Sequence, residues 1–361
     1  MRTSLISVLS LNLGLVLGQS CLPSNSSNAW QQKTFNTLVT FGDSYTDENR
    51  LGYFINHNGS APPTGWEGGV NYDASSGGRI WARYASIYSN LNLYNYAVSG
   101  AVCSNKISPR YFSAINAPFP DILGYELPAF IADSNYTSPN GTAFFTGKPS
   151  DTIYTIWIGT NDIGNYAFLT DSQVRGKTLP DYLSCVYQVV KALYDNGARY
   201  FVLMNLAPLQ LAPLYATPEN DGVKNAPFWP DKPSNITEVS YRMWESVATL
   251  NALYEYRTPF ELLIADSYPE AKIANFDVNA LMTDIWTHPE GYLNGTEKAN
   301  VTGFVKHCQG SGANQTCSRR ESPDSYVWFD ELHPSEQVDR VIAKEFGEVV
   351  KGVSRWAKYW G

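Results

Sequence analysis

Five short runs of β-branched and aromatic residues alternate with helix-like segments along this chain of 361 residues. The strand candidates are Thr37–Phe41, Asn92–Val98, Thr152–Ile158, Arg199–Asn205 and Lys272–Phe276. The helix candidates are Arg79–Tyr88, Asp121–Ala132, Asp181–Asn196, Ile236–Leu263, Val278–Trp286 and Ser335–Val353. Strands that alternate with helices form a parallel sheet covered on both faces. We therefore predict an α/β fold, a three-layer α/β/α sandwich around a central parallel sheet.

Three of the strand candidates end in small polar clusters. These clusters are Gly42-Asp43-Ser44, Ser99-Gly100 and Gly159-Thr160-Asn161-Asp162. Ligands of such sheets bind beyond the carboxyl ends of the strands, so the three clusters predict one shared site. Because all three belong to one alternating pattern, we expect a single domain over residues 19–361, although the length alone suggests about two. Residues 288–327 are expected to be loop.

Ser44 is the candidate nucleophile. It follows a buried strand candidate, and Thr46 and Asp47 after it are residue types that cap helices. We expect Ser44 at the junction of a strand and a helix, where backbone N–H groups and the positive helix end are close. That arrangement suits a nucleophile whose attack creates an oxyanion. The alternative is an ordinary capping serine in a loop.

A nucleophilic serine needs a base, and His333 is the best candidate among the four histidines. Asp330 lies three residues earlier, where its carboxylate can hold one ring nitrogen and leave the other for Ser44. Glu331 is the alternative orienting acid. For the motif alone, a surface turn without chemistry is the other reading.

An oxyanion also needs hydrogen-bond donors. The N–H group of Ser44, the N–H group of Gly100 and the side-chain amide of Asn161 are the candidates. Taken alone, Asn161 and Gly100 are better explained as ordinary turn residues. Together with His333 and Asp330 they form a complete set for acyl transfer.

The order of these blocks resembles the GDSL, or SGNH, esterase/lipase superfamily. The matching blocks are Gly42-Asp43-Ser44-Tyr45, Asn95-Tyr96-Ala97-Val98-Ser99-Gly100, Gly159-Thr160-Asn161-Asp162 and Asp330-Glu331-Leu332-His333-Pro334. The resemblance covers most of residues 37–353 and implies a flavodoxin-like α/β/α fold. It also implies catalytic roles for Ser44, Gly100, Asn161 and His333. Tyr45 replaces the usual leucine, and it either forms part of the pocket wall or points into the core.

Within that superfamily the chain is similar to fungal acetylesterases of carbohydrate esterase family sixteen, over Thr40–Gly69 and Tyr72–Arg83. This implies a secreted serine esterase that removes acetyl groups from plant cell-wall oligosaccharides through a Ser-His-Asp triad and an acyl-enzyme. The alternative enzyme is a lipase or phospholipase acting on longer acyl esters. A carbohydrate-binding protein without catalysis is a third hypothesis, which loss of Ser44, Asn161 or His333 would favour, and none is lost.

The N-terminus predicts export. Met1 and Arg2 precede an apolar run, Leu5–Leu17, that is too short to span a bilayer, so residues 1–18 are interpreted as a signal peptide. Acceptor sequences for N-glycosylation begin at Asn25, Asn58, Asn135, Asn140, Asn235, Asn294, Asn300 and Asn314. We therefore expect a secreted, extracellular glycoprotein without stable membrane insertion.

Five cysteines suit an oxidising compartment. Cys308 and Cys317 flank a Gly/Ser/Asn-rich loop and are expected to pair, whereas a pair of Cys103 with Cys185, leaving Cys21 single, is possible.

The remaining composition limits the partners. The formal charge of −8 argues against nucleic acid. No metal and no cofactor are expected, because His57, His288, His307 and His333 lack ligand spacing. We expect a monomer that binds a small acetylated oligosaccharide or ester. The candidates for stacking on sugar rings, with core packing as the alternative, are Trp66, Trp81, Trp157, Trp229 and Trp328.

Overall fold

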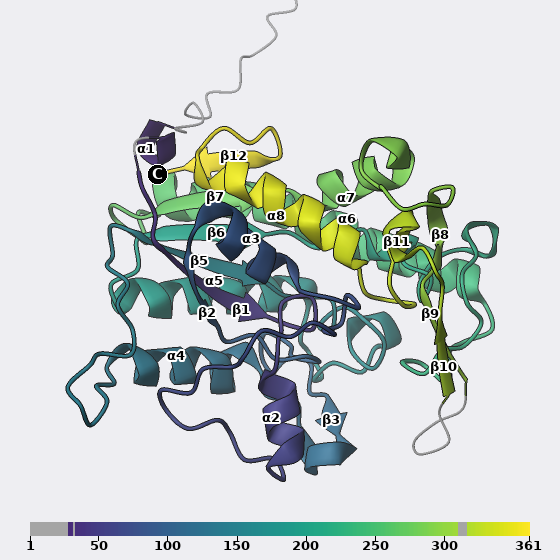
Figure 1. The fold of residues 1–361 in the computed structure, drawn as a ribbon, viewed down its shortest axis with the longest axis horizontal. Coiled ribbons are helices and arrows are strands. Elements are labelled where there is room, and N and C mark those ends of the chain that lie inside the picture. Colours follow the sequence, from purple (N-terminus) through teal and green to yellow (C-terminus); the bar gives the residue numbers. More distant parts are fainter. Residues whose placement is uncertain (1–27, 32, 310–315) are drawn as a thin grey trace, which may run out of the picture.

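The computed structural model describes residues 28–31, 33–309 and 316–361, and a six-stranded sheet lies at its centre (Figure 1). The strand order is β12-β7-β6-β5-β1-β2. The strands are β1 (Thr37–Gly42), β2 (Asn92–Asn95), β5 (Thr152–Trp157), β6 (Tyr200–Met204), β7 (Lys272–Phe276) and β12 (Ala357–Trp360). The first five run parallel, as predicted, whereas the unpredicted β12 pairs antiparallel with β7.

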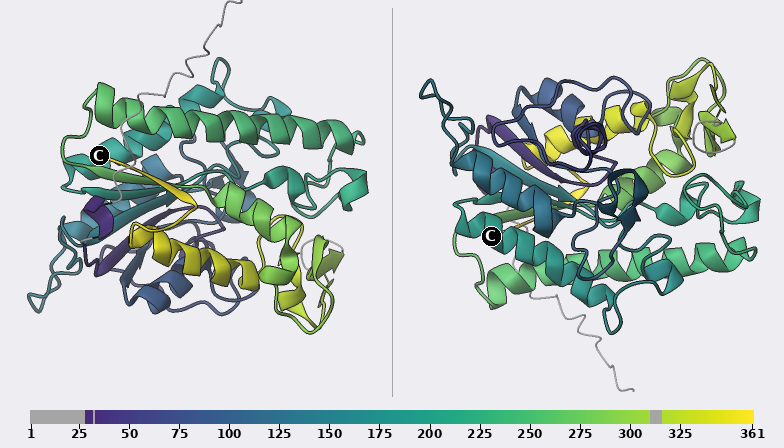
Figure 2. Two further views of the ribbon diagram at one scale, coloured as in Figure 1. Left: turned by 90° about the horizontal axis from the view of Figure 1, so that it is seen from above. Right: turned by 90° about the horizontal axis from the view of Figure 1, so that it is seen from below.

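Helices cover both faces of this sheet (Figure 2). Helices α3 (Trp81–Ser89) and α8 (Glu336–Val350) pack together on one face, and α5 (Leu179–Asp195) and α6 (Ile236–Pro259) lie on the other. The predicted three-layer α/β/α sandwich is therefore confirmed. The remaining elements include α1 (Asn28–Gln31), α2 (Arg50–Asn56), α4 (Leu127–Ser134), α7 (Val278–Thr287), β3 (Tyr111–Phe112) and β4 (Ala117–Pro118).

The structure differs clearly from the expected elements at β2 and in residues 288–327. Strand β2 ends at Asn95 and not at Val98, although the N–H groups of Tyr96 and Val98 still donate to β1 carbonyls. The expected loop at residues 288–327 contains β8 (Asn300–Phe304), β9 (Lys306–Gln309), β10 (Thr316–Arg319) and β11 (Tyr326–Trp328). Polar composition hides these strands, and β9 and β10 pair where Cys308 lies opposite Cys317.

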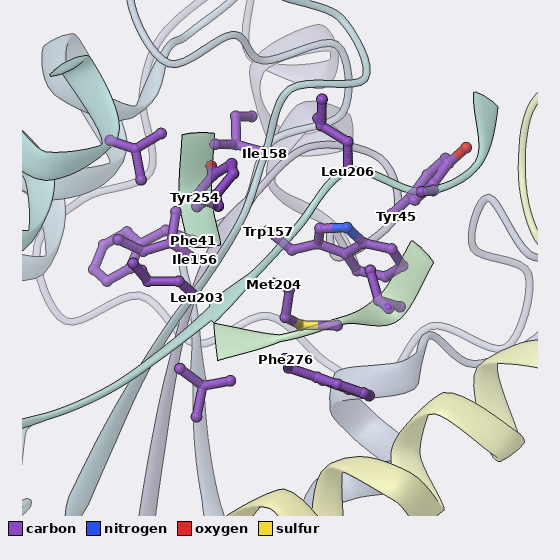
Figure 3. Packing of buried hydrophobic residues seen from close by; sticks show 14 of the residues in the cluster. Phe41, Tyr45, Ile156, Trp157, Ile158, Leu203, Met204, Leu206, Tyr254 and Phe276 are labelled. Atoms are coloured by element: carbon purple, nitrogen blue, oxygen red, sulfur yellow. The ribbon is translucent and has the colours of Figure 1, made fainter. Parts of the chain in front are cut away.

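The core is built on the two central strands, since every residue of β1 and β5 is buried. Trp157 packs against Tyr45 and lies near Met204 and Phe276 in the interior (Figure 3). The proposal that several tryptophans stack on sugar is wrong for four of them. Trp81, Trp157, Trp229 and Trp328 are at most 3% exposed because they fill the core. One cluster of buried side chains runs through the sheet and its helices, which supports our proposal of a single domain.

Gly42 marks where β1 reaches its neighbour most closely. A Cβ atom at this position would lie 2.3 Å from the carbonyl oxygen of Trp157 on β5. Only glycine therefore lets the two strands stay paired up to the last residue of β1. Ser44 follows two residues later, at the carboxyl edge of the sheet.

Two disulfides are present. Cys308 pairs with Cys317, as expected, and Cys103 pairs with Cys185, the pairing that the sequence left possible. Cys21 lies outside the described residues. The first bridge closes a short hairpin, whereas the second joins α5 to the loop after β2 across a sequence separation of 82.

The two bridges are expected to stabilise the fold unequally. A disulfide restricts the unfolded chain more when it closes a longer loop, by about 4 kcal/mol for Cys103–Cys185 and about 2–3 kcal/mol for Cys308–Cys317. Replacing both cysteines of each pair by alanine and titrating with urea measures the two losses in free energy of unfolding. An equal loss for both pairs would contradict the loop-length account.

Candidate active site

Ser44, His333 and Asp330 lie in one hydrogen-bonded line at the carboxyl edge of the sheet. Ser44 Oγ is 2.8 Å from His333 Nε2, and His333 Nδ1 is 2.8 and 2.9 Å from the two carboxylate oxygens of Asp330. All three residues are at most 8% exposed. The structure thus brings together the candidate nucleophile, base and orienting acid from opposite ends of the chain.

The local structure at Ser44 differs from the expectation of a strand–helix junction. Ser44 sits in a tight turn in which the carbonyl oxygen of Asp43 accepts from the N–H groups of Thr46 and Asp47, both at 2.9 Å. Helix α2 begins only at Arg50. Asp47 caps that helix and not the turn, since its carboxylate accepts from the Arg50 N–H group at 2.8 Å. The turn itself, without a helix end, presents the serine.

The spacing of Asp330 and His333 follows from a second turn. One carboxylate oxygen of Asp330 accepts from the backbone N–H groups of Leu332 and His333, at 2.9 and 2.8 Å. This folds the chain so that the imidazole returns to the same carboxylate. Burial opposes the charge of Asp330, but the charge and hydrogen bonds of His333 outweigh it and lower the pKa of Asp330.

The contact with Asp330 also shifts the pKa of His333, the candidate base. Burial lowers the pKa of His333, yet the charge and hydrogen bond of Asp330 prevail and raise that pKa above its usual 6.5. Glu331, the alternative acid, makes no hydrogen bond to His333 in the described part of the chain. Burial raises the pKa of Glu331 to about 7, so it is a poor anionic partner.

Tyr45 points into the core and does not form part of the pocket wall. Its side chain is 3% exposed, and its hydroxyl donates to the carbonyl oxygen of Leu332 at 2.7 Å. Its ring lies 5.1 Å from that of Trp157 and 5.7 Å from that of His333. Tyr45 therefore links the turn that carries Ser44 to the loop that carries His333.

Ser44, Gly100 and Asn161, the residues with the three candidate N–H donors, line the same pocket. The backbone N–H groups of Ser44 and Gly100 have no acceptor among the described residues. Asn161 Nδ2 donates one hydrogen to the Ala101 carbonyl at 2.9 Å, which leaves its second hydrogen available. Gly100 has φ +83°, and a Cβ there would lie 2.3 Å from the Phe119 ring, so both conformation and space require glycine.

Buried carboxylates fix the loop that carries Gly100. Asp47 accepts from the N–H and hydroxyl groups of Ser99, both at 2.8 Å. Asp162, which follows Asn161, accepts from the N–H of Cys103 at 2.9 Å. The loop is thus attached, on both sides of Gly100, to the segments that follow β1 and β5.

A pocket of about 550 Å³ opens over these groups. Its lining combines polar side chains, among them Asn71, Asp73 and Asn165, with several phenylalanines. Phe228 is 41% exposed, and its ring lies 5.5 Å from that of His333. Sequence reasoning missed Phe228 and also Arg110, because neither belongs to a motif block. Across the described ranges, no group of three or more His, Cys, Asp or Glu residues is arranged to hold a metal ion.

Comparison with known proteins places this site in a family. The model of the GDSL-like lipase/acylhydrolase family matches residues 38–346, so the chain belongs to that family and is a carboxylic ester hydrolase. Among curated relatives, an acetylesterase of Hypocrea jecorina is 38% identical over 90% of this chain and 92% of its own length. An acetylesterase of Thermothelomyces thermophilus is 24% identical over 87% and 88%. Among solved structures, an acetylxylan esterase of Geobacillus stearothermophilus has a TM-score of 0.37 and 12% identity over 90% of this chain and 98% of its own.

The raised pKa of His333 predicts the pH dependence. The protonated imidazole cannot accept the proton of Ser44, so kcat/KM should rise with pH through a midpoint above 6.5. Asp330→Asn removes the anion that raises this pKa, so the midpoint should move to lower pH. The same change should lower kcat by about 10⁴-fold because the imidazole loses its orientation.

Glu331→Gln is the matched control for Asp330→Asn, since it changes the adjacent carboxylate in the same way. It should lower the midpoint less than Asp330→Asn does, because the charge of Glu331 contributes less than that of Asp330 to the raised pKa of His333. It should keep kcat within about threefold of the parent, because Glu331 makes no hydrogen bond to His333 in the described structure. Rate measurements from pH 5 to 9 compare the two variants. A large loss in Glu331→Gln with a mild one in Asp330→Asn would reverse the assignment.

Proposed function

We propose that this protein is a secreted acetylesterase that removes acetyl groups from carbohydrates such as plant cell-wall oligosaccharides. The observation that carries the proposal is the line of Ser44 Oγ, His333 Nε2 and Asp330, in a pocket that the candidate donors Gly100 and Asn161 also line. A serine hydroxyl that is hydrogen-bonded to a histidine base can lose its proton to that base as it attacks a carbonyl carbon.

In the proposed reaction, Ser44 Oγ attacks the carbonyl carbon of the ester while His333 Nε2 takes the hydroxyl proton. The negative oxygen of the tetrahedral intermediate accepts hydrogen bonds from the N–H groups of Ser44 and Gly100 and from Asn161 Nδ2. The intermediate expels the sugar alkoxide, which receives the proton from His333. His333 then takes a proton from water, whose oxygen attacks the carbonyl carbon of the acetyl-Ser44 ester. The second tetrahedral intermediate breaks its bond to Ser44 Oγ, which takes the proton back from His333, and acetate leaves.

Two observations support an acetylated sugar as the substrate. The acetylesterase of Hypocrea jecorina is 38% identical over nearly the whole chain. The pocket combines polar side chains, which suit hydroxyl groups, with the exposed ring of Phe228 beside His333. His333 protonates the leaving sugar alcohol in the proposed reaction, so the sugar ring must lie near His333 and therefore near Phe228. The aromatic face of Phe228 can stack on that ring.

Export is supported by the disulfides and by accessible glycosylation candidates. Asn58, Asn135, Asn140, Asn235 and Asn294 are exposed, and Asn300 is half-buried. Asn25, Asn314 and the signal-peptide candidate at residues 1–18 lie outside the described residues. In the part that the structure describes, no helix is both long and apolar enough to cross a membrane.

The nucleophile can be tested directly. Ser44→Ala should abolish hydrolysis of 4-nitrophenyl acetate without unfolding the protein, and a fluorophosphonate probe should label Ser44 in the parent protein. Ser354→Ala is a matched control, since Ser354 has nearly the same burial, 8% against 7%, and lies outside the pocket. Full activity in Ser44→Ala, with labelling elsewhere, would overturn the assignment.

The substrate is tested by a comparison of acyl chains. We expect kcat/KM to fall from acetate to butyrate to octanoate esters, because an apolar pocket gains only about 1–3 kcal/mol per methylene and a short one excludes longer chains by steric clash. Acetate should also be released from acetylated xylo-oligosaccharides. A preference for octanoate, or no acetate from sugars, would instead support the lipase or phospholipase alternative.

A further inference from the structure

Arg110 is the cation that lies against the candidate oxyanion donors, although it belongs to none of the motif blocks. One terminal nitrogen, Nη1, donates to the Gly100 carbonyl at 3.1 Å and also to Asn161 Oδ1. The guanidinium stands 5.3 Å from the centre of the Phe119 ring, the same ring that packs on Gly100. The residue comes from the segment just before β3 and lines the pocket.

We infer that Arg110 is a positioning residue of the oxyanion hole, acting through the amide of Asn161. This inference rests on the proposed function, since it concerns the intermediate formed at Ser44. Its basis is the pair of contacts that hold the two ends of one amide group.

An asparagine amide has two nearly isosteric ends, and only its NH₂ end can stabilise an oxyanion. Here Nδ2 of Asn161 meets the Ala101 carbonyl, and Oδ1 meets the Arg110 guanidinium. A flipped amide would set oxygen against oxygen and N–H against N–H. Both contacts therefore select the orientation that leaves one Nδ2 hydrogen for the substrate.

The charge of Arg110 also acts on the site. A cationic donor on Oδ1 withdraws electron density from the amide and makes its N–H groups stronger donors. In the described part of the chain no carboxylate lies within ion-pair distance of Arg110, unlike Arg83, which pairs with Glu48 at 2.7 Å. Asp43 and Asp162 interact with Arg110 through their charge, but burial raises their pKa values to about 6 and about 8, which weakens that charge near neutral pH. The positive field of Arg110 is therefore only partly offset and can act on an anion beside Ser44.

Arg110→Met should remove the charge and both hydrogen bonds at similar volume. We expect kcat for 4-nitrophenyl acetate, normalised to the fraction of Ser44 labelled by the phosphonate probe, to fall 10–100-fold with KM changed less than about threefold. Arg110→Lys, which keeps the charge, should recover part of kcat.

Arg199→Met is the matched control and should retain kcat. Arg199 likewise donates through Nη1 to two carbonyl oxygens and stacks 4.4 Å from Tyr194, but it lies at the opposite edge of the sheet.

A double-mutant cycle tests whether Arg110 acts through Asn161. Asn161→Ala should lower kcat by about 10²–10³-fold. Adding Arg110→Met should cause less than about a threefold further loss, because the group that it positions is already gone. Multiplicative losses, an unchanged kcat in Arg110→Met, or a raised KM at constant kcat would overturn the inference. If Arg110→Met does not fold, Arg110→Gln, which also removes the charge, takes its place in both tests with the same expected results.

The proposed function and the proposed role of Arg110 can be contradicted separately. If the parent protein hydrolyses no ester, the proposed function is wrong. If the parent is active and Ser44→Ala is inactive, but Arg110→Met behaves like Arg199→Met, only the role of Arg110 is wrong.

Discussion

Three loops must be held at one edge of the sheet for this site to exist, and buried carboxylates hold them. Glu126 is fully buried and accepts from the N–H group of Gly42 at 3.0 Å and from that of Val98 at 3.2 Å. It thereby joins the end of β1 to the chain leaving β2, just before Ser44 and Gly100. Burial raises the pKa of Glu126 well above its usual value, whereas the hydrogen bonds from these two N–H groups lower it. The two hydrogen bonds thus offset part of the free-energy cost of burying this polar group. Together with the contacts of Asp47 and Asp162, these hydrogen bonds fix the segments that carry the proposed oxyanion donors.

The sheet order explains why these particular loops meet. The chain passes from β1 outward to β2 and then returns to β5 on the other side of β1. The carboxyl ends of β1 and β5 therefore diverge into different loops at the point where the order reverses, which is where open α/β sheets bind ligands. Ser44 follows β1 and Asn161 follows β5. The histidine and its acid arrive from a separate turn before α8, tied in by the hydroxyl of Tyr45.

The sequence was informative where a residue's environment is set locally. Runs such as Thr152–Trp157 predict strands because β-branched and aromatic side chains suit a buried sheet, and the polar residues after them locate the site. Local patterns were misleading at Ser44, where capping residues predicted a helix that starts only at Arg50. They gave no sign of β12, which completes the sheet by pairing with the distant β7. Arg110 and Phe228 were missed for the same reason, since their roles depend on contacts with residues far away in the chain.

The central claim is that Ser44 Oγ attacks an ester carbonyl and that three N–H groups receive the resulting negative oxygen. A crystal structure of the protein after reaction with a small methylphosphonate ester tests it most directly, because the adduct resembles the tetrahedral intermediate. The account predicts phosphorus bonded to Ser44 Oγ, with one phosphoryl oxygen about 2.7–3.1 Å from the N–H nitrogens of Ser44 and Gly100 and from Asn161 Nδ2. An adduct on another residue, or one whose oxygen turns away from Gly100 and Asn161, would contradict it.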